Sequence, residues 1–255
     1  MLSYRAVLPV SSQTLRYVVK IIAGYRAQIR SRWRRLSPYR QAVLVLAYLH
    51  DNLPFTRLAA SFGVGVATAW RYVAETVGLL AMRAPGLAEA LRTAAGRGWR
   101  VVLADGTLIP IDRVADQAPY YSGKHRRHGM LILVLAGPQG ELLWCSKAYG
   151  ARTHELTAAD ECGLLWATSQ AELAVLADKG YQGAPGHVLT PYRAERGWPL
   201  PAQYKKANTA HAAARGPGER ANSTLKTWRV LHKYRSSPHR ATALTQAILT
   251  LQTRP

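Results

Sequence analysis

Two segments of the chain carry four or five consecutive apolar residues that run directly into an aspartate. The first is Val101–Ala104, followed by Asp105, and the second is Leu173–Ala177, followed by Asp178. Uninterrupted apolar runs of this length are typical of buried strands. We therefore expect two strands of one sheet that end at Asp105 and Asp178, with the two carboxylates side by side. Like charges repel, so a divalent cation between them is the simplest reason for such a pair.

Helical periodicity dominates the first third of the chain. Apolar residues at steps of three and four predict a basic amphipathic helix from Gln13 to about Trp33 and a second helix over Tyr39–Asp51. The positive face of the first helix fits either a solvated surface or an arm that contacts phosphates, and the pattern leaves both open. A turn-rich stretch that ends near residue 97 predicts a linker, and hence domains at 1–97 and 98–255.

The segment Pro54–Val73 has the layout of a helix-turn-helix. Gly63 occupies the tight turn, and Thr68 and Arg71 point outward from the second helix, toward a DNA groove. The positions expected to pack inward are Leu58, Ala59, Phe62, Val64, Ala69 and Val73. An ordinary helical hairpin has a similar pattern, but the basic surroundings favour DNA binding.

The last two thirds of the chain alternate strand and helix patterns, which indicates an α/β domain. Met130–Ala136 and Glu141–Lys147 flank a Gly-Pro-Gln-Gly turn and predict a β-hairpin. Thr153–Thr168 is helical in pattern, and Val188–Thr190 is a short candidate strand.

Charge narrows the class of partner. The 255 residues include 34 Lys and Arg against 14 Asp and Glu, a net charge of +20. Such an excess points to a polyanion, most simply double-stranded DNA, while a basic protein that merely stays soluble is the plainer alternative. Two cysteines without metal-ligand spacing, the lack of an apolar run of membrane length, and an N-terminus without a signal-peptide pattern lead us to expect a cytoplasmic, nucleoid-associated protein without a membrane partner.

Two further basic segments are candidates for contact with DNA. The stretch Tyr120–Gly129 is predicted to be a loop and carries Lys124, Arg126 and Arg127. The stretch 216–233 is predicted to be a helix whose apolar stripe is Ala221, Leu225, Trp228 and Leu231, and whose polar stripe is Glu219, Asn222, Lys226, Arg229 and Lys233. From Lys179 onward there are thirteen Lys and Arg but only two acids, Glu195 and Glu219. A functional role for Glu219 is one reading, and a carboxylate that complements the helix dipole is the other.

Asp105, Asp178 and Glu219 together would suit two Mg²⁺ ions, with Mn²⁺ as the alternative. Mg²⁺ prefers oxygen ligands and completes its shell with phosphates and water. Two such ions roughly 3.5–4 Å apart promote in-line displacement at phosphorus. Lys226 could hold the neighbouring phosphate.

The sequence as a whole resembles the DDE transposases of bacterial insertion sequences. The resemblance rests on Leu103–Thr107, Tyr121–Gly129, Ala177–Gly183, and Gly218–Asn222 with Lys226–Leu231. It implies an RNase H-like catalytic domain, a mixed sheet flanked by helices, after an all-α helix-turn-helix domain. It also implies metal-dependent cleavage at transposon ends, strand transfer into target DNA and homo-oligomers on DNA. By this resemblance Asp105, Asp178 and Glu219 are the catalytic metal ligands.

Two alternatives remain at this level. A DNA-binding regulator or decayed copy would keep the helix-turn-helix and the charge without catalysis. An endonuclease that cuts without rejoining would use the same metal site, so the sequence does not separate it from a transposase.

Overall fold

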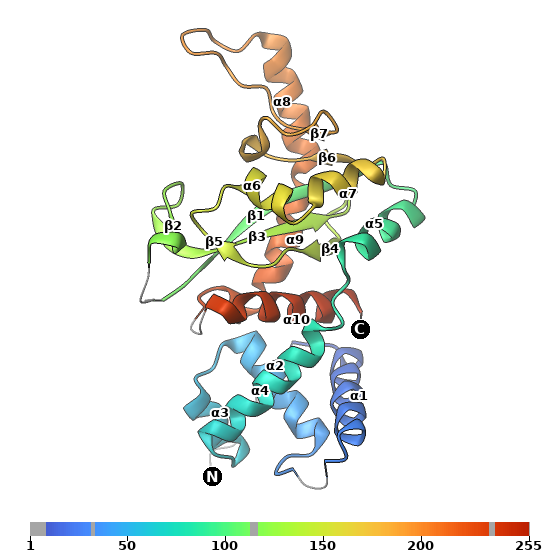
Figure 1. Cartoon of the computed structure of the whole chain (residues 1–255), viewed down its shortest axis with the longest axis vertical. Helices are drawn as coiled ribbons and strands as arrows, with labels where there is room; N and C mark the ends of the chain where they lie inside the picture. Colours follow the sequence, from blue (N-terminus) through green and yellow to red (C-terminus); the bar gives the residue numbers. More distant parts are fainter. Residues whose placement is uncertain (1–8, 32–33, 113–116, 235–237, 255) are drawn as a thin grey trace.

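The computed structural model describes residues 9–31, 34–112, 117–234 and 238–254 (Figure 1). Its N-terminal part is helical: α1 (Ser12–Gln28), α2 (Pro38–Asp51), α3 (Phe55–Phe62), α4 (Val66–Ala81) and α5 (Leu87–Gly96). The strands are β1 (Val101–Pro110), β2 (Tyr121–Ser122), β3 (Arg127–Ala136), β4 (Leu142–Cys145), β5 (Tyr149–Gly150), β6 (Ala174–Leu176) and β7 (Val188–Leu189). The later helices are α6 (Glu155–Glu161), α7 (Leu164–Gln170), α8 (Ala202–Arg215), α9 (Pro217–Lys226) and α10 (Ala241–Thr253), with short 3-10 turns η1 (Ala118–Tyr120), η2 (Lys179–Tyr181), η3 (Arg229–Leu231) and η4 (Pro238–Arg240). None of the described helices is long and apolar enough to cross a bilayer.

The helix-turn-helix forms as the pattern predicts. α3 ends at Gly63, whose φ of 65° is a left-handed conformation that glycine adopts without strain, and α4 follows after a short turn. Leu58, Ala69 and Val73 are buried between the helices. The first predicted helix is shorter than expected: α1 ends at Gln28, and the left-handed Arg30 follows it, while Trp33 lies outside the described residues.

One mixed sheet forms the centre of the second part. Its strand order is β2-β3-β1-β6-β7, with β4 and β5 also paired to β3. β1 is antiparallel to β3 and parallel to β6, and β6 is parallel to β7. Helices lie on both faces, so the predicted class, a helix-turn-helix region before an RNase H-like α/β domain, is confirmed.

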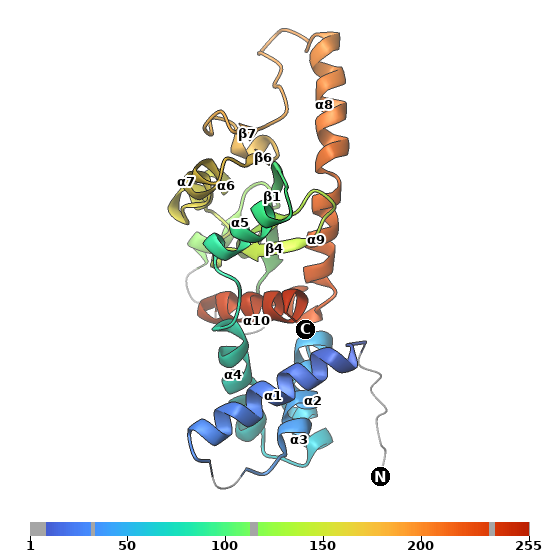
Figure 2. The same cartoon turned by 90° about the vertical axis from the view of Figure 1, so that its right-hand side faces the viewer.

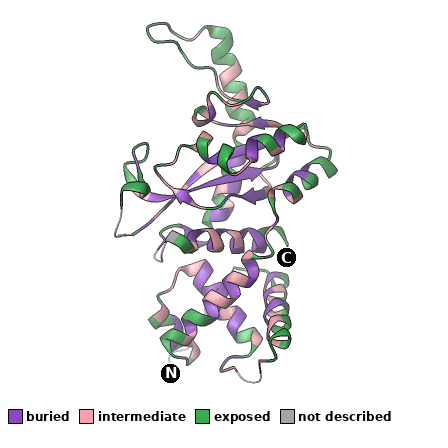
Figure 3. Cartoon of the chain, viewed as in Figure 1, coloured by how far each residue is buried: buried purple, intermediate pink, exposed green. Residues whose placement is uncertain are grey.

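The two faces of the sheet pack against different helices. α5, α6 and α7 share one apolar cluster with the face that carries Val102 and Ala104. α9 and α10 cover the face that carries Leu103. This second cluster continues through α10 into α2 and α4, so α10 lies between the sheet and the helix-turn-helix region (Figures 1 and 3). The boundary near residue 97 stays a prediction.

Four local predictions were wrong. The expected helix over 216–233 ends at Lys226 as α9, because Trp228 adopts an extended backbone conformation before η3. The expected helix Thr153–Thr168 is two helices, because Gly163 adopts a φ of +75° between α6 and α7. The expected basic loop Tyr120–Gly129 is largely a hairpin of β2 and β3. β1 does not end at Asp105: it runs on to Pro110 because β3 pairs with it along its length.

α5, α8 and α10 were not predicted, and α5 occupies most of the stretch that was expected to be a linker. α8 extends away from the sheet and continues almost directly into α9 (Figure 2), since Gly216 between them keeps helical dihedral angles. The apolar residues of α8 are alanines and one tyrosine, which form no bulky apolar stripe, and none of its residues is buried.

Candidate active site

Asp105 and Asp178 are brought together by the parallel pairing of β1 and β6. Leu103 pairs with Leu176, the last residue of β6, and each aspartate follows two residues later. β6 has therefore left the ladder opposite Asp105, and this opens a gap beside β1. Asp178 caps the η2 turn, where its Oδ1 accepts a hydrogen bond of 2.7 Å from the Gly180 amide. The sequence-based prediction that these two carboxylates are neighbours agrees with this arrangement.

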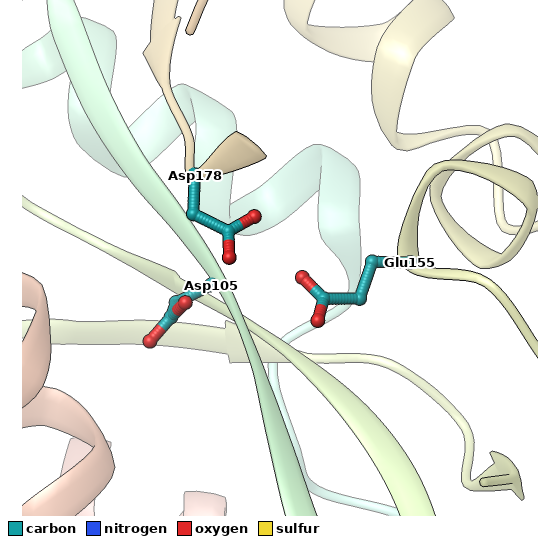
Figure 4. A group of neighbouring side chains, drawn as sticks. All are labelled: Asp105, Glu155 and Asp178. Atoms are coloured by element: carbon teal, nitrogen blue, oxygen red, sulfur yellow. The ribbon is translucent and has the colours of Figure 1, made fainter. Parts of the chain in front are cut away.

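Glu155 completes the group from the opposite face of the sheet. It is the first residue of α6, and one oxygen from each of Asp105, Glu155 and Asp178 lies within 4.8 Å of the other two (Figure 4). Glycines make room for its side chain. A Cβ at Gly106 would lie 2.6 Å from the Glu155 Cδ, and one at Gly180 would lie 3.1 Å from its Oε2. The glycines that follow both aspartates thus allow the third carboxylate to approach.

Cationic and amide groups hold the three carboxylates in place. Arg215, at the end of α8, donates to Asp105 Oδ1 at 3.2 Å, and Asn222 of α9 donates to its Oδ2 at 2.7 Å. The Lys124 ammonium lies 3.1 Å from Glu155 Oε1 and 3.5 Å from Asp178 Oδ2. Lys124 is 60% exposed, so solvent screens this ion pair and weakens it.

The electrostatics of the group favour a bound cation. Burial raises the pKa of Glu155, and the neighbouring Asp178 charge raises it further against the opposing effect of Lys124. Burial likewise raises the pKa of Asp105, partly offset by Arg215. Glu155 Oε2 is buried without a hydrogen-bond partner among the described residues. Three converging carboxylates, one with a free buried oxygen, form a donor set that fits a hard divalent ion.

Glu219 does not belong to this group. It lies in the first turn of α9 with an exposed side chain, and the described residues within 4.8 Å of one another are Asp105, Glu155 and Asp178. It is four residues after Arg215 and three before Asn222, both of which bond to Asp105. Positions spaced in this way share one helix face, so Glu219 lies on the side of the continuous α8–α9 helix that faces Asp105.

Among the basic candidates of the β2–β3 turn and of α9, Lys124 is the one that contacts the carboxylates. The pKa of His125 is lowered, first by burial and then by the positive charges of Lys124, Arg127 and Lys226. The β2–β3 turn and the end of α9 therefore lie close together. Arg126, in the same turn, and Arg229, in η3, are exposed as well.

The helix-turn-helix presents its own basic hollow. Thr68 and Arg71 of α4 line it together with Arg34, Arg35 and the turn. Arg71 is exposed and Thr68 is half-buried, so the two predicted contact residues lie on one accessible surface.

Sequence reasoning missed Glu155, Arg215 and Asn222 as parts of the site. Glu155 follows no apolar run, and nothing in its spacing from Asp105 or Asp178 marks it. The available signal was the glycine after Asp105, which indicates that another group approaches the backbone there.

Comparisons with known proteins identify the family of the chain. The family model for DDE superfamily endonucleases matches residues 104–252, more than half of the chain. The model for the helix-turn-helix of DDE superfamily endonucleases matches residues 34–86. The chain belongs to the DDE superfamily endonucleases, and the predicted helix-turn-helix is confirmed.

Two relatives cover most of the chain. A protein of Streptomyces albus G assigned as the transposase for insertion sequence element IS112 is 26% identical over 239 residues, which cover 90% of this chain and 86% of the relative. A protein of Microchaete diplosiphon assigned as the transposase for insertion sequence element IS702 is 25% identical over 241 residues, covering 91% and 86%. No solved structure matches the chain. The resemblance to DDE transposases stated from the sequence is confirmed by these matches.

Proposed function

We propose that this chain is the transposase of an insertion sequence, which cuts DNA at the ends of its element and joins those ends to target DNA. The observation that carries the proposal is the convergence of Asp105, Glu155 and Asp178 in a domain of the DDE endonuclease family. The helix-turn-helix, the net charge of +20 and the two transposase relatives support DNA as the substrate. We further propose that it acts in the cytoplasm on the nucleoid, as a homo-oligomer, because two ends must be brought together.

The carboxylates would hold divalent ions, with Mg²⁺ as the first choice and Mn²⁺ as the second. Asp105 and Asp178 would be ligands in this proposal. Glu155 would supply a third carboxylate from one face of the sheet, and Glu219 would supply a further one from α9. Ions bound there would lower the cost of negative charge on the attacking and leaving oxygens.

Residues around the carboxylates would position the DNA. Lys124 pairs with Glu155 and Asp178, and with a metal ion on those carboxylates its ammonium would be available for a phosphate next to the scissile bond. Lys226, Arg126, Arg127 and Arg229 hold the strand on either side. Arg215 and Asn222 keep Asp105 in one orientation, so that its oxygens remain aimed at the gap beside β6.

A cleavage assay tests the proposal. Duplexes that carry the ends of the element are incubated with wild type in Mg²⁺, Ca²⁺ or EDTA, and pre-cut ends are supplied with a target plasmid. Cleavage and joining that require Mg²⁺ support a transposase. Cleavage without joining would instead identify an endonuclease, and metal-independent binding without cleavage would identify a regulator.

Metal binding should be visible as a change in stability. Since burial and Asp178 raise the pKa of Glu155, its ionised form opposes folding, and this penalty grows as the pH rises through the raised pKa. Glu155→Gln should therefore raise the melting temperature at pH 7.5 by a few degrees. Millimolar Mg²⁺ should raise the melting temperature of wild type but not of Glu155→Gln, as differential scanning fluorimetry can measure.

The same measurement has a pH dependence. Protons compete with Mg²⁺ for these carboxylates, so the Mg²⁺-induced gain should vanish on acidification at a pH above the ordinary glutamate value of about 4.3. An equal Mg²⁺ effect in wild type and Glu155→Gln would contradict the assignment of Glu155 as a ligand.

Arg71→Ala should weaken recognition of the specific DNA ends. A lost base contact costs about 1–3 kcal/mol, which corresponds to a roughly 5- to 150-fold lower affinity, with little change for unrelated DNA. Arg92→Ala, which removes an exposed arginine from α5, is the control. Competitive gel-shift titration measures both, and equal losses would show that Arg71 contributes only general charge.

A further inference from the structure

A protruding arm, residues 191–215, remains unexplained by the site described above. It consists of an extended segment up to Pro201 and the helix α8, which returns to the sheet (Figures 1 and 2). No residue of α8 is buried. Tyr192 and Trp198 on the extended segment are 51% and 75% exposed. A 14-residue helix without a buried side chain lacks the packing that normally stabilises a helix in a folded protein.

Specific contacts nevertheless build the arm as a defined unit. Asn208 of α8 accepts a hydrogen bond from the Tyr192 amide at 2.7 Å and donates one to the Tyr192 carbonyl at 2.9 Å. The rings of Tyr192 and Tyr204 stack with their centroids 4.3 Å apart. At the base of the arm, Gln182 donates to the Pro191 carbonyl at 3.0 Å. These contacts join the start of the extended segment to α8 through Tyr192 and tie it to the sheet domain through Gln182.

The arm begins at the carboxylate site. His211 of α8 lies 2.9 Å from the carbonyl oxygen of Ala177, the residue before Asp178, and Arg215 donates to Asp105. From there α8 runs outward for about 21 Å at 1.5 Å per residue. DNA with a phosphate at the carboxylates must pass the base of this helix.

The charge of the arm indicates which class of molecule it binds. The arm holds five Lys and Arg and the single acid Glu195, a net charge of +4. Four of these cations are exposed and have no ion-pair partner among the described residues: Arg193, Arg196, Lys205 and Lys206. A second copy of the chain, itself at +20, is a poor match for this surface, whereas a polyanion is a good one.

We propose that the arm is a second DNA-binding surface, separate from the helix-turn-helix, which holds the phosphate backbone of the duplex next to the cleaved bond. The proposal rests on the proposed function in that it takes the carboxylates as the place of cleavage. An arm of about 21 Å tracks roughly six base pairs, at 3.4 Å per base pair. Lys205 and Lys206 contact phosphates from α8, and Arg193 and Arg196 do so from the extended segment.

The first test measures duplex affinity in EDTA, where no cleavage occurs. Full-length Lys205→Gln/Lys206→Gln is compared with wild type and with the control Arg92→Gln/Arg100→Gln, which removes two exposed arginines outside the arm. The probe is a fluorescein-labelled 40-base-pair duplex, titrated by anisotropy from 50 to 300 mM KCl. Circular dichroism and melting temperature verify that each variant is folded.

Two lost phosphate contacts should lower the slope of log K against log[salt] by about 1.8. At 0.1 M salt this corresponds to a roughly 10- to 60-fold loss of affinity. The control should change both quantities much less. Equal behaviour of the arm variant and the control would overturn the proposal.

The second test identifies what touches the arm. Benzoylphenylalanine introduced in place of Trp198 is irradiated in the complex with the radiolabelled duplex. A protein–DNA adduct supports the proposal, while an adduct between two protein chains and none with DNA overturns it and assigns the arm to an interface between copies. Neither test requires cleavage, so a wild-type protein that does not cleave DNA would refute the proposed function but not the role of the arm. If wild type cleaves DNA and the arm variant binds duplex as tightly as the control variant does, the role of the arm would be refuted but not the proposed function.

Discussion

Asp105→Asn should abolish Mg²⁺-dependent DNA cleavage while DNA binding persists. Asp105 lies beside Asp178 and accepts a hydrogen bond from Asn222 of α9. The substitution replaces its carboxylate with an amide, which keeps the shape of the side chain but removes its charge. Removal of a metal ligand is worth several kcal/mol of transition-state stabilisation, so the rate should fall at least about 10³-fold. A nicking time course on end-bearing duplex, beside a gel shift of the same duplex, measures both effects.

Asp160→Asn provides the matched control for this experiment. Asp160 is an exposed carboxylate on α6, outside the carboxylate group. It should cleave at the wild-type rate. If Asp105→Asn retained more than a tenth of the wild-type rate, or lost DNA binding as severely as cleavage, the carboxylate would have a structural role instead.

Glu155→Gln and Glu219→Gln should both impair cleavage, and they should differ in their effect on metal affinity. Glu155 lies among the carboxylates, with a buried oxygen that has no partner among the described residues, so its loss should raise the Mg²⁺ concentration needed for half-maximal cleavage at least about tenfold. Glu219 is exposed on α9, so its loss should lower the maximal rate and leave the melting temperature without metal unchanged. Mg²⁺ titrations of the cleavage rate separate the two effects.

The double comparison tests whether both glutamates contribute to the metal site. Full activity of Glu219→Gln with an inactive Glu155→Gln would remove Glu219 from the catalytic set. The opposite result would mean that the Glu155 carboxylate is only a structural neighbour of the aspartates. Exposed Glu172, which adopts a left-handed backbone conformation after α7, gives a control as Glu172→Gln, because it keeps the same φ preference and removes one distant charge.

The sequence was most informative where a local pattern has only one structural solution. Helical periodicity with a glycine at residue 63 predicted the helix-turn-helix, because that turn requires a positive φ. Apolar runs before Asp105 and Asp178 predicted two adjacent strands, because parallel neighbours bring equivalent positions to the same place in a sheet. Predictions of element ends were weaker, as in the continuation of β1 past Asp105, because the length of a strand depends on its partner.

Several features of the site were decided by tertiary structure alone. Glu155 reaches the aspartates because α6 covers the opposite face of the sheet and Gly106 leaves space for its side chain. α8 has no apolar stripe, so its sequence pattern did not predict a helix that extends outward from the site.

By itself, the sequence determined the class of this protein: a helix-turn-helix, a buried sheet with two aspartates and a strong positive charge. These are properties of near neighbours along the chain and of composition, which no folding step changes. The tertiary structure decided which acid joins the two aspartates, which groups hold Asp105, and where the unpaired cations of the arm lie. The contacts around the aspartates join residues 23 to 117 positions apart, and they depend on packing across the whole domain.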